Sequence, residues 1–298
     1  MMLEGNIRDG VTEKDYIDLH VHSVKSDGTY TIPELVAYAA EKRLKVMALT
    51  DHDTVLGLDE IHSEAESVPN APKIVNGVEL STDRDGKDIH IVGLFIDYKE
   101  PSFTDYLKDF RDSRDERNRK MCKKLRDGLN MDISIEQLKE RFPGAVITRA
   151  HYGRYMLENG YTRSVQEAFD RWIGDDGPYF IPREKVPPEK GVELIRKAHG
   201  IPVLAHPLLY KLSAERLEKL IVSLKDAGLA AMETRYTTHN SSDVRRLQLL
   251  TEKYGLLESG GSDFHGKNKP DVDLAVGHGN LNVPYEIYKK LKEYGEQL

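Results

Sequence analysis

The hydrophobic positions of this 298-residue chain form short apolar runs that alternate with amphipathic segments of helical period. The short runs are rich in Val, Ile and Leu, which is typical of buried strands. They predict seven strands, at residues 16–21, 45–50, 73–78, 90–96, 202–205, 229–233 and 256–260. Helices are predicted between most of them, at 33–43, 56–67, 189–198, 214–227 and 242–254. This alternation predicts an α/β fold of parallel strands with helices packed outside, and seven such strands are enough to close a barrel.

One long stretch interrupts this alternation, because residues 101–188 contain no strand-like run. Helical patterns are predicted there at 103–129, 135–141, 150–158 and 165–172. Prolines from Pro178 to Pro188 then predict a linker back to the barrel. We therefore expect a helical insertion between the fourth and fifth strands, with the barrel itself formed by residues 15–100 and 189–298.

The composition narrows the possible functions. Fifty acidic against 43 basic residues give a net charge of −7, which disfavours general binding to polyanions such as duplex nucleic acid. A single cysteine, Cys122, excludes a disulfide framework, a cysteine-based zinc site and an iron–sulfur cluster. The sequence has no run of 18 apolar residues, and its first 14 residues lack the apolar core of a signal peptide. We expect a cytoplasmic protein with no membrane span and a loose N-terminal extension.

Side chains with metal-binding chemistry lie at the ends of the predicted strands. The first strand carries His20 and His22, which are two positions apart and therefore share one face of the strand. Two neutral imidazoles on one face suit a divalent metal, although this motif alone fits a structural pair equally well. The second strand is followed by Asp51, His52 and Asp53, and three ionisable groups directly after an apolar strand are costly unless they face a site.

The other strand ends also carry side chains of the ligand type. Because the carboxyl ends of parallel strands meet at one face of a barrel, we expect these side chains to converge. The candidate metal ligands are His20, His22, Asp27, His52, Glu79, His90, His206, Asp263 and His265. Imidazole and carboxylate donors without a thiolate fit Zn, Mn or Fe.

These motifs resemble those of the PHP (polymerase and histidinol phosphatase) superfamily. The resemblance runs from about Tyr16 to Gly266 and rests on DLHVHSVKSDGTY, LTDHDT, GVE, IHIVG, LAHP and GGSDFHG. It implies a distorted (β/α)7 barrel, which agrees with the seven predicted strands. The closest likeness is to the stand-alone branch with a helical insertion, which includes nucleoside 3′,5′-bisphosphate phosphatases and 5′-to-3′ exoribonucleases.

The resemblance also implies a centre of three divalent metal ions. One ion would be held by His20, His22, Glu79 and Asp263; a second by Glu79, His90 and His206; and a third by Asp27, His52 and His265. The implied reaction is hydrolysis of a phosphoester by a metal-bound water, with phosphate oxygens held at the remaining coordination positions. The ligands expected to take part in catalysis are Asp27, His52, Glu79, His206, Asp263 and His265.

Residues outside the ligand set are expected to contact substrate. Arg149 and His151 lie in a motif that resembles the bisphosphatase branch, and a guanidinium suits a second phosphate. The alternative is a helix start with a surface arginine and a packed histidine. His239 follows the sixth strand, where it can face substrate or be a plain loop residue; the family often has a Pro-Ser-His-like run here, whereas this chain has Thr-Thr-His.

Two further interpretations stay open from the residues alone. Asp51 and Asp53 either orient the ligand histidines or cap the following helix. The arginine-rich segment 111–119 is typical of a solvated, salt-bridged helix face, from which one arginine can turn inward. Phe169 and Trp172 fit the core of the insertion better than a stacking platform for bases.

The function expected from these features is a metal-dependent phosphoesterase. Its substrate would be a nucleoside 3′,5′-bisphosphate or a short 5′-phosphorylated RNA, and not duplex nucleic acid. A histidinol-phosphate-type phosphatase is the first alternative. A metal-dependent amidohydrolase also uses His-x-His on its first strand, but a lysine on a middle strand would favour it and Glu79 stands there instead. A non-catalytic PHP binding module usually lacks ligands, and this chain keeps all nine.

Overall fold

The protein is described by a computed structural model that covers residues 16–174, 176–181 and 186–297. Its strands form one seven-stranded sheet in which each strand pairs with the next along the chain. The sheet curls into a nearly closed barrel, because the backbone N–H of His22 donates to the carbonyl of Phe264 and that of Asp263 donates to the carbonyl of His20. The strands are β1 (Ile17–Val21), β2 (Val46–Leu49), β3 (Lys73–Arg84), β4 (Lys87–Leu94), β5 (Ile201–Leu204), β6 (Ala231–Tyr236) and β7 (Leu257–Gly261).

The expectation that all strands run parallel is wrong for β4. This strand pairs antiparallel with both β3 and β5, whereas the other neighbouring pairs are parallel. β3 is also twice as long as expected, since it continues past residue 78 to Arg84 and turns through Asp85 and Gly86 into β4. Both turn residues have a positive φ, 56° and 80°, as the tight turn of a hairpin requires. The reversal leaves the barrel wall continuous, because the hairpin still adds two strands to the sheet.

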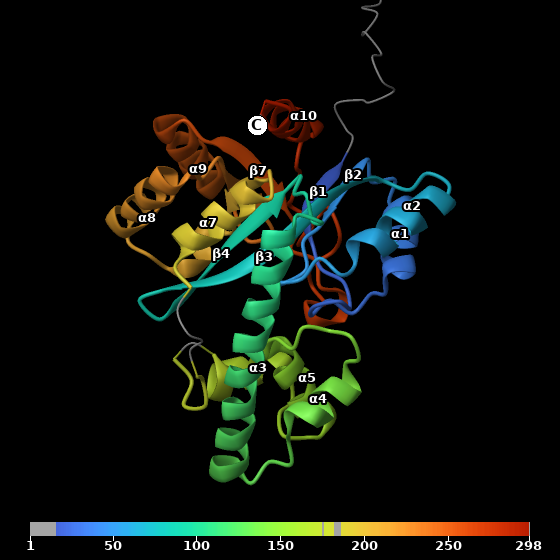
Figure 1. The fold of residues 1–298 in the computed structure, drawn as a ribbon, viewed down its shortest axis with the longest axis vertical. Coiled ribbons are helices and arrows are strands. Elements are labelled where there is room, and N and C mark those ends of the chain that lie inside the picture. The colour runs from blue at the N-terminus through green and yellow to red at the C-terminus, as the bar shows by residue number, and fades with distance from the viewer. Residues whose placement is uncertain (1–15, 175, 182–185, 298) are drawn as a thin grey trace, which may run out of the picture.

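Helices cover the outside of the barrel, and Figure 1 shows them on both flanks and at one end. They are α1 (Ile32–Glu41), α2 (Leu58–Ser67), α7 (Pro188–Lys197), α8 (Ala214–Ala227), α9 (Ser241–Tyr254) and α10 (Tyr285–Gly295), with short 3₁₀ turns η2 (Pro207–Tyr210) and η3 (Gly266–Asn268). The first five match the predicted helices. The start of α1 also follows its sequence signal, because Thr31 and Glu34 form a capping box beside a proline in the first turn. α10 was not predicted, although its side chains pack against the strands.

The chain between β4 and α7 is helical, as expected, and projects from one side of the barrel (Figure 1). Its elements are α3 (Pro101–Leu129), α4 (Ile135–Arg141), α5 (Arg149–Glu158), α6 (Val165–Ala168) and the π-helical turn η1 (Phe169–Ile173). α3 begins at a proline capped by Glu100 and ends where Asn130 takes a left-handed φ of 50°. Residues 182–185, in the predicted return linker, and residues 1–15, in the predicted N-terminal extension, lie outside the described residues.

The apolar side chains form separate clusters that explain how the helical segment is attached. The N-terminal half of α3 contributes Phe103, Leu107 and Phe110 to the cluster between the barrel and its outer helices. The C-terminal half contributes Met121 and Leu125 to a different cluster, shared with α4, α5 and η1. α3 therefore packs in both clusters and connects the barrel with the helical insertion. None of the described helices has the length and apolar character needed to cross a membrane.

Candidate metal centre and its cavity

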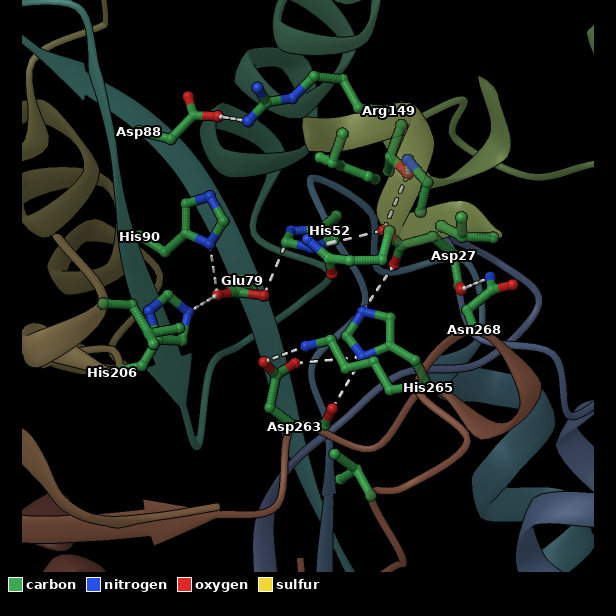
Figure 2. A pocket seen from close by; sticks show the side chains of 18 of the residues that line it. Asp27, His52, Glu79, Asp88, His90, Arg149, His206, Asp263, His265 and Asn268 are labelled. Atoms are coloured by element: carbon green, nitrogen blue, oxygen red, sulfur yellow. Dashed lines mark hydrogen bonds and ion pairs between the residues drawn. The ribbon is translucent and has the colours of Figure 1, made fainter. Parts of the chain in front are cut away.

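All nine predicted ligands lie at one end of the barrel, where Figure 2 shows several of them around Glu79. Most follow the carboxyl ends of parallel strands, as expected. His90 does not, because it lies in the first half of β4. It reaches the same end of the barrel since β4 runs in the opposite direction, and its register partner is Ser81, just beyond Glu79 on β3. Glu79 lies in the middle of β3 rather than at its end.

Glu79 is the centre of the cluster. Its Oε2 lies 3.1 Å from Nε2 of His20, 3.1 Å from Nε2 of His22 and 3.2 Å from Nδ1 of His52. Its Oε1 lies 2.8 Å from Nδ1 of His90 and 3.0 Å from Nε2 of His206. Five imidazoles thus surround one buried carboxylate: two lie on β1 and β4, and three lie just beyond the ends of β1, β2 and β5.

Two further carboxylates flank this centre. Asp263 Oδ1 lies 3.3 Å from Nε2 of His22 and 3.2 Å from Nδ1 of His265. Asp27 Oδ1 lies 3.1 Å from Nε2 of His265, and Asp27 Oδ2 lies 3.8 Å from Nε2 of His52. His52 and His265 therefore each stand between two carboxylates, so the ligand set is continuous rather than three separate patches.

Three groups of side chains have donor atoms close enough to hold one ion each. They are His20, His22, Glu79 and Asp263; His22, Asp27, His52 and His265; and His52, Glu79 and His90. The first group is the one that the resemblance implies. The second contains the implied set of Asp27, His52 and His265 and adds His22. The third has His52 where His206 was expected, although His206 lies beside the same Glu79 oxygen as His90.

The donor atoms themselves fit a metal better than they fit one another. Nε2 of His20, Nε2 of His22, Nδ1 of His52 and Oδ1 of Asp27 are buried, and within the described residues none of these atoms has a hydrogen-bond partner. Buried polar atoms in proteins are rarely left unpaired, and buried charges are paired or coordinate metals. The imidazole and carboxylate set therefore fits divalent cations.

The pKa values of the cluster reflect the same crowding of charges. Burial lowers the pKa of His22, but the nearby carboxylates of Asp263 and Glu79 outweigh it and raise that pKa to about 9. For His52 burial prevails and lowers the pKa to about 3. Burial opposes ionisation of Glu79, yet the charges of the surrounding histidines hold its pKa well below the ordinary value. The carboxylate at the centre is thus ionised and available to cations.

The backbone around the cluster is held in uncommon conformations. Asp53, His206 and Asp263 have φ values of 53°, 24° and 56°, which side-chain-bearing residues rarely adopt. Such conformations persist only where the surrounding structure fixes them, and they concentrate at functional sites. Gly261 has a related role: a Cβ there would lie 2.4 Å from Cβ of His20, so only glycine lets β7 approach β1 this closely.

Four buried carboxylates outside the predicted ligand set accept hydrogen bonds from the ligands or from residues beside them. Asp51 accepts hydrogen bonds from the hydroxyls of Ser23 and Ser26, both at 2.6 Å. Asp53 accepts from the backbone of Ser81 and from Arg114. Neither caps α2, whose N-cap is Gly57 without a side-chain bond, so the capping interpretation is wrong.

The other two carboxylates, Asp18 and Glu233, were not predicted as part of the site. Glu233 Oε1 lies 2.8 Å from Nδ1 of His20, and its Oε2 accepts the backbone N–H of His206 at 2.6 Å. Asp18 accepts the backbone N–H groups of Ser262 and Ala275 at 2.9 and 2.8 Å. A carboxylate on the remaining nitrogen of a ligand histidine fixes its tautomer and orientation. The sequence signal that could have identified Asp18 and Glu233 is an acidic residue within an otherwise apolar, buried strand.

The cluster opens into a cavity of about 880 Å³ between the barrel end and the helical segment. Arg114 and Arg117, on the barrel side of α3, are buried in its wall, so two arginines of the 111–119 segment turn inward rather than one. Arg149 also lines the cavity: its guanidinium lies 2.6 Å from Asp88 Oδ2 (Figure 2) and over the ring of Phe180 at 4.8 Å. Cationic side chains from α3 and α5 thus face the ligand cluster.

The other two predicted substrate contacts are placed differently. His151 is buried and does not line the cavity; its Nδ1 accepts the backbone N–H of Thr148 at 3.0 Å, and burial lowers its pKa to about 4. Thr148 in turn donates to Asp27 Oδ2 at 2.8 Å, so His151 holds in place a residue that contacts a candidate ligand.

His239 is buried beside Tyr236, with Nδ1 3.1 Å from the carbonyl of Thr234. Contact of either histidine with substrate stays a prediction. Phe169 packs in the insertion as expected and also lines the cavity.

The PHP domain family matches residues 18–294, which is most of the chain and spans every predicted ligand. The chain belongs to the PHP domain family. This confirms the resemblance seen in the sequence motifs.

Among curated PHP relatives, a 5′-3′ exoribonuclease of Haemophilus influenzae is 34% identical over 87% of this chain and 96% of its own. A 3′,5′-nucleoside bisphosphate phosphatase of Chromobacterium violaceum is 32% identical over 88% of this chain and 90% of its own.

Solved structures agree with the PHP fold. An amidohydrolase of Chromobacterium violaceum, with sulfate bound, superposes with a TM-score of 0.83 at 30% identity, over 93% of this chain and 96% of its own. A metal-dependent phosphoesterase of Bifidobacterium adolescentis gives a TM-score of 0.79 at 24% identity, over 93% and 95% of the two chains, and supports the fold alone. The α/β barrel is therefore confirmed, and the PHP family together with the names of the curated relatives bears out an enzyme that hydrolyses phosphoester bonds.

Proposed function

We propose that this PHP protein removes a terminal phosphate from small nucleotides, such as nucleoside 3′,5′-bisphosphates, or from short 5′-phosphorylated RNA. The arrangement around Glu79 carries the proposal: one buried carboxylate lies within 3.2 Å of five imidazoles at the base of a cavity lined with arginines. Two curated relatives, named a 5′-3′ exoribonuclease and a 3′,5′-nucleoside bisphosphate phosphatase, match most of the chain. The amidohydrolase alternative is not favoured, because the middle strand carries Glu79.

We assign the nine clustered side chains as ligands of three divalent cations, Mn, Zn or Fe. Bound cations of this kind hold phosphate oxygens and activate water for attack on phosphorus. Glu79, which belongs to two of the groups of donors, would be shared between two of the ions. Glu233 keeps His20 and the backbone of His206 in place, and Asp51 keeps the Ser23–Ser26 turn in place beside His22. Six of these ligands are also assigned a part in catalysis: Asp27, His52, Glu79, His206, Asp263 and His265.

The helical insertion, residues 101–188, is proposed as the substrate cap. Its side of the cavity supplies Arg117 and Arg149, whose guanidinium groups suit phosphate oxygens that do not touch the metal centre. Arg149 now pairs with Asp88, which is partly exposed, so a second phosphate can replace that carboxylate as its partner. The cavity volume suits a nucleotide or the end of a short strand. We also propose that the enzyme is cytoplasmic. Its net charge of −7 disfavours duplex nucleic acid as a substrate.

Replacing Arg149 with alanine is expected to raise KM for adenosine 3′,5′-bisphosphate by about 10- to 100-fold, because a charged hydrogen bond to the second phosphate is lost. KM for 4-nitrophenyl phosphate, which has no second phosphate, is expected to stay within about twofold. Steady-state kinetics on both substrates measure the difference. Arg171→Ala is the matched control, because Arg171 is exposed and pairs with Glu167 on the same side of the molecule. Equal increases in KM for the two substrates would show that Arg149 has a structural role and does not bind the second phosphate.

The proposed substrate class is tested by phosphate release from three compounds assayed side by side with Mn²⁺. These are adenosine 3′,5′-bisphosphate, a 5′-phosphorylated RNA pentamer and histidinol phosphate. The proposal expects the nucleotide or the RNA to give the highest kcat/KM, because only they place a second phosphate against Arg149. Histidinol phosphate as the best substrate would instead support the alternative phosphatase.

A further inference from the structure

Two lysines follow the last candidate ligand, and they point in different directions. Lys269 Nζ lies 2.5 Å from Asp263 Oδ2, inside the site. Lys267 is exposed and lines the outer part of the same cavity, on the side of α1: the pKa of Glu34, on α1, is lowered by the hydrogen bonds from Thr31 and also by the charge of Lys267. Of these two lysines, Lys269 is the one whose ammonium is paired with a candidate ligand.

The two oxygens of Asp263 have separate partners. Oδ1 faces His22, His265 and, at 3.7 Å, Nε2 of His20, so it is the oxygen available to a cation. Oδ2 accepts the hydroxyl of Tyr236 at 2.7 Å and the ammonium of Lys269. A cation on Oδ1 therefore leaves Lys269 in place on Oδ2, directly beside the metal centre.

The segment that carries Lys269 is fixed against the loop that carries Asp27. The amide of Asn268 donates to the carbonyl of Asp27 at 2.7 Å, and the backbone N–H of Lys267 donates to Thr29 at 2.8 Å. Gly266, with φ of 60°, allows this approach, since a Cβ there would lie 2.3 Å from the hydroxyl of Thr29. The ammonium is thus held in place before substrate arrives, which is what electrostatic stabilisation of a transition state requires.

The position of Lys269 between the cluster and the cavity indicates which atom it meets. Its side chain is 38% exposed, whereas that of Asp263 is 5% exposed, so the lysine lies where the buried cluster opens into the cavity. A phosphate bound at the ligand cluster would have its ester oxygen and the rest of the substrate on the cavity side, where Lys269 lies. Resting on the proposed function, we propose that Lys269 is a catalytic residue whose ammonium donates a hydrogen bond to the ester oxygen that leaves.

The step requires no further reactant. The oxygen of water bonds to phosphorus, the bond between phosphorus and the ester oxygen breaks, and its electron pair goes to that oxygen. The negative charge that grows there is met by the Lys269 ammonium, which turns from Asp263 Oδ2 or shares its protons between the two oxygens. The attacking water releases one proton to solvent, and the leaving oxygen takes one from solvent.

A series of aryl phosphates tests this role, because the charge left on the ester oxygen depends on the aryl group. Lys269→Ala is expected to lower kcat for phenyl phosphate by about 100-fold. For 4-nitrophenyl phosphate, whose nitro group spreads the charge, the expected loss is below about fivefold, so the dependence of log kcat on leaving-group acidity becomes steeper. Lys269→Arg, which keeps a cationic donor, is expected to restore part of the loss.

The controls separate this role from loss of fold or of metal. Lys289→Ala, at an exposed lysine of α10 that pairs with Glu286 and does not line the cavity, is expected to leave the rates with both substrates unchanged. Metal content by elemental analysis is expected to match wild type in every variant. Lys269→Gln repeats the test with a side chain of similar length. Equal losses on both aryl phosphates, or losses that follow the metal content, would overturn the role of Lys269. If the wild-type chain releases no phosphate from any substrate with metal present, the proposed function falls, and this inference with it.

Discussion

Replacing Glu79 with glutamine is expected to lower kcat by about a thousandfold or more and to reduce the bound metal. The carboxylate lies within 3.2 Å of five imidazoles, and no other described side chain contacts all of those rings. An amide keeps the shape but loses the charge, and its NH₂ group presents donors where cations need an acceptor. Losing several kcal/mol of transition-state stabilisation corresponds to this fall in rate.

Two measurements make the Glu79 prediction decisive. Elemental analysis after dialysis should show fewer ions per chain than wild type, while circular dichroism should show the same helix and strand content. Glu258→Gln is the matched control, because Glu258 is a partly buried carboxylate on β7 that bonds Thr234 and Gln248, away from the cluster. If Glu79→Gln keeps full metal and more than a tenth of the activity, Glu79 is not the central ligand.

Replacing Arg114 with alanine is expected to destabilise the protein by about 3–5 kcal/mol. The guanidinium, only 6% exposed, pairs with the buried carboxylate of Asp53 and donates to the hydroxyl of Ser81 at 2.8 Å. Removing it takes this cation away from the buried Asp53 carboxylate, which costs far more than the loss of a surface ion pair. Urea unfolding followed by circular dichroism measures the change.

The same substitution also tests how the helical segment is attached to the site. Asp53 neighbours His52 in sequence and has a left-handed φ of 53°, so its pairing with Arg114 ties α3 to a candidate ligand. Arg119→Ala, five residues further along α3 and exposed, is expected to change stability by less than about 0.5 kcal/mol. Similar unfolding midpoints for Arg114→Ala and Arg119→Ala would contradict the buried ion pair.

Local sequence pattern predicted the barrel and the cluster because both depend on short-range signals. His20 and His22 are two positions apart in a strand, and apolar runs before Asp51 and His206 mark strands whose ends meet. The β3–β4 hairpin was missed because residues 80–86 are mostly polar and resemble a loop. Asp85-Gly86 between alternating positions was the overlooked hairpin signal.

The supporting residues could not be predicted because their roles depend on contacts between distant segments. Glu233 touches His20 across 213 positions, and Arg114 meets Asp53 across 61. Nothing in the spacing of α3 distinguishes Arg114 and Arg117 from their exposed neighbours, since acidic residues surround all of them. Likewise, only the fold shows that Lys269, and not Lys267, faces Asp263.

The most direct test of the whole account is metal removal followed by reconstitution, with phosphate release from adenosine 3′,5′-bisphosphate as the readout. The chelated and dialysed chain is expected to release no phosphate above background, and stepwise addition of Mn²⁺ is expected to restore release, which reaches a plateau near three ions per chain. Undiminished phosphate release from a chain shown by elemental analysis to be free of metal would contradict this expectation.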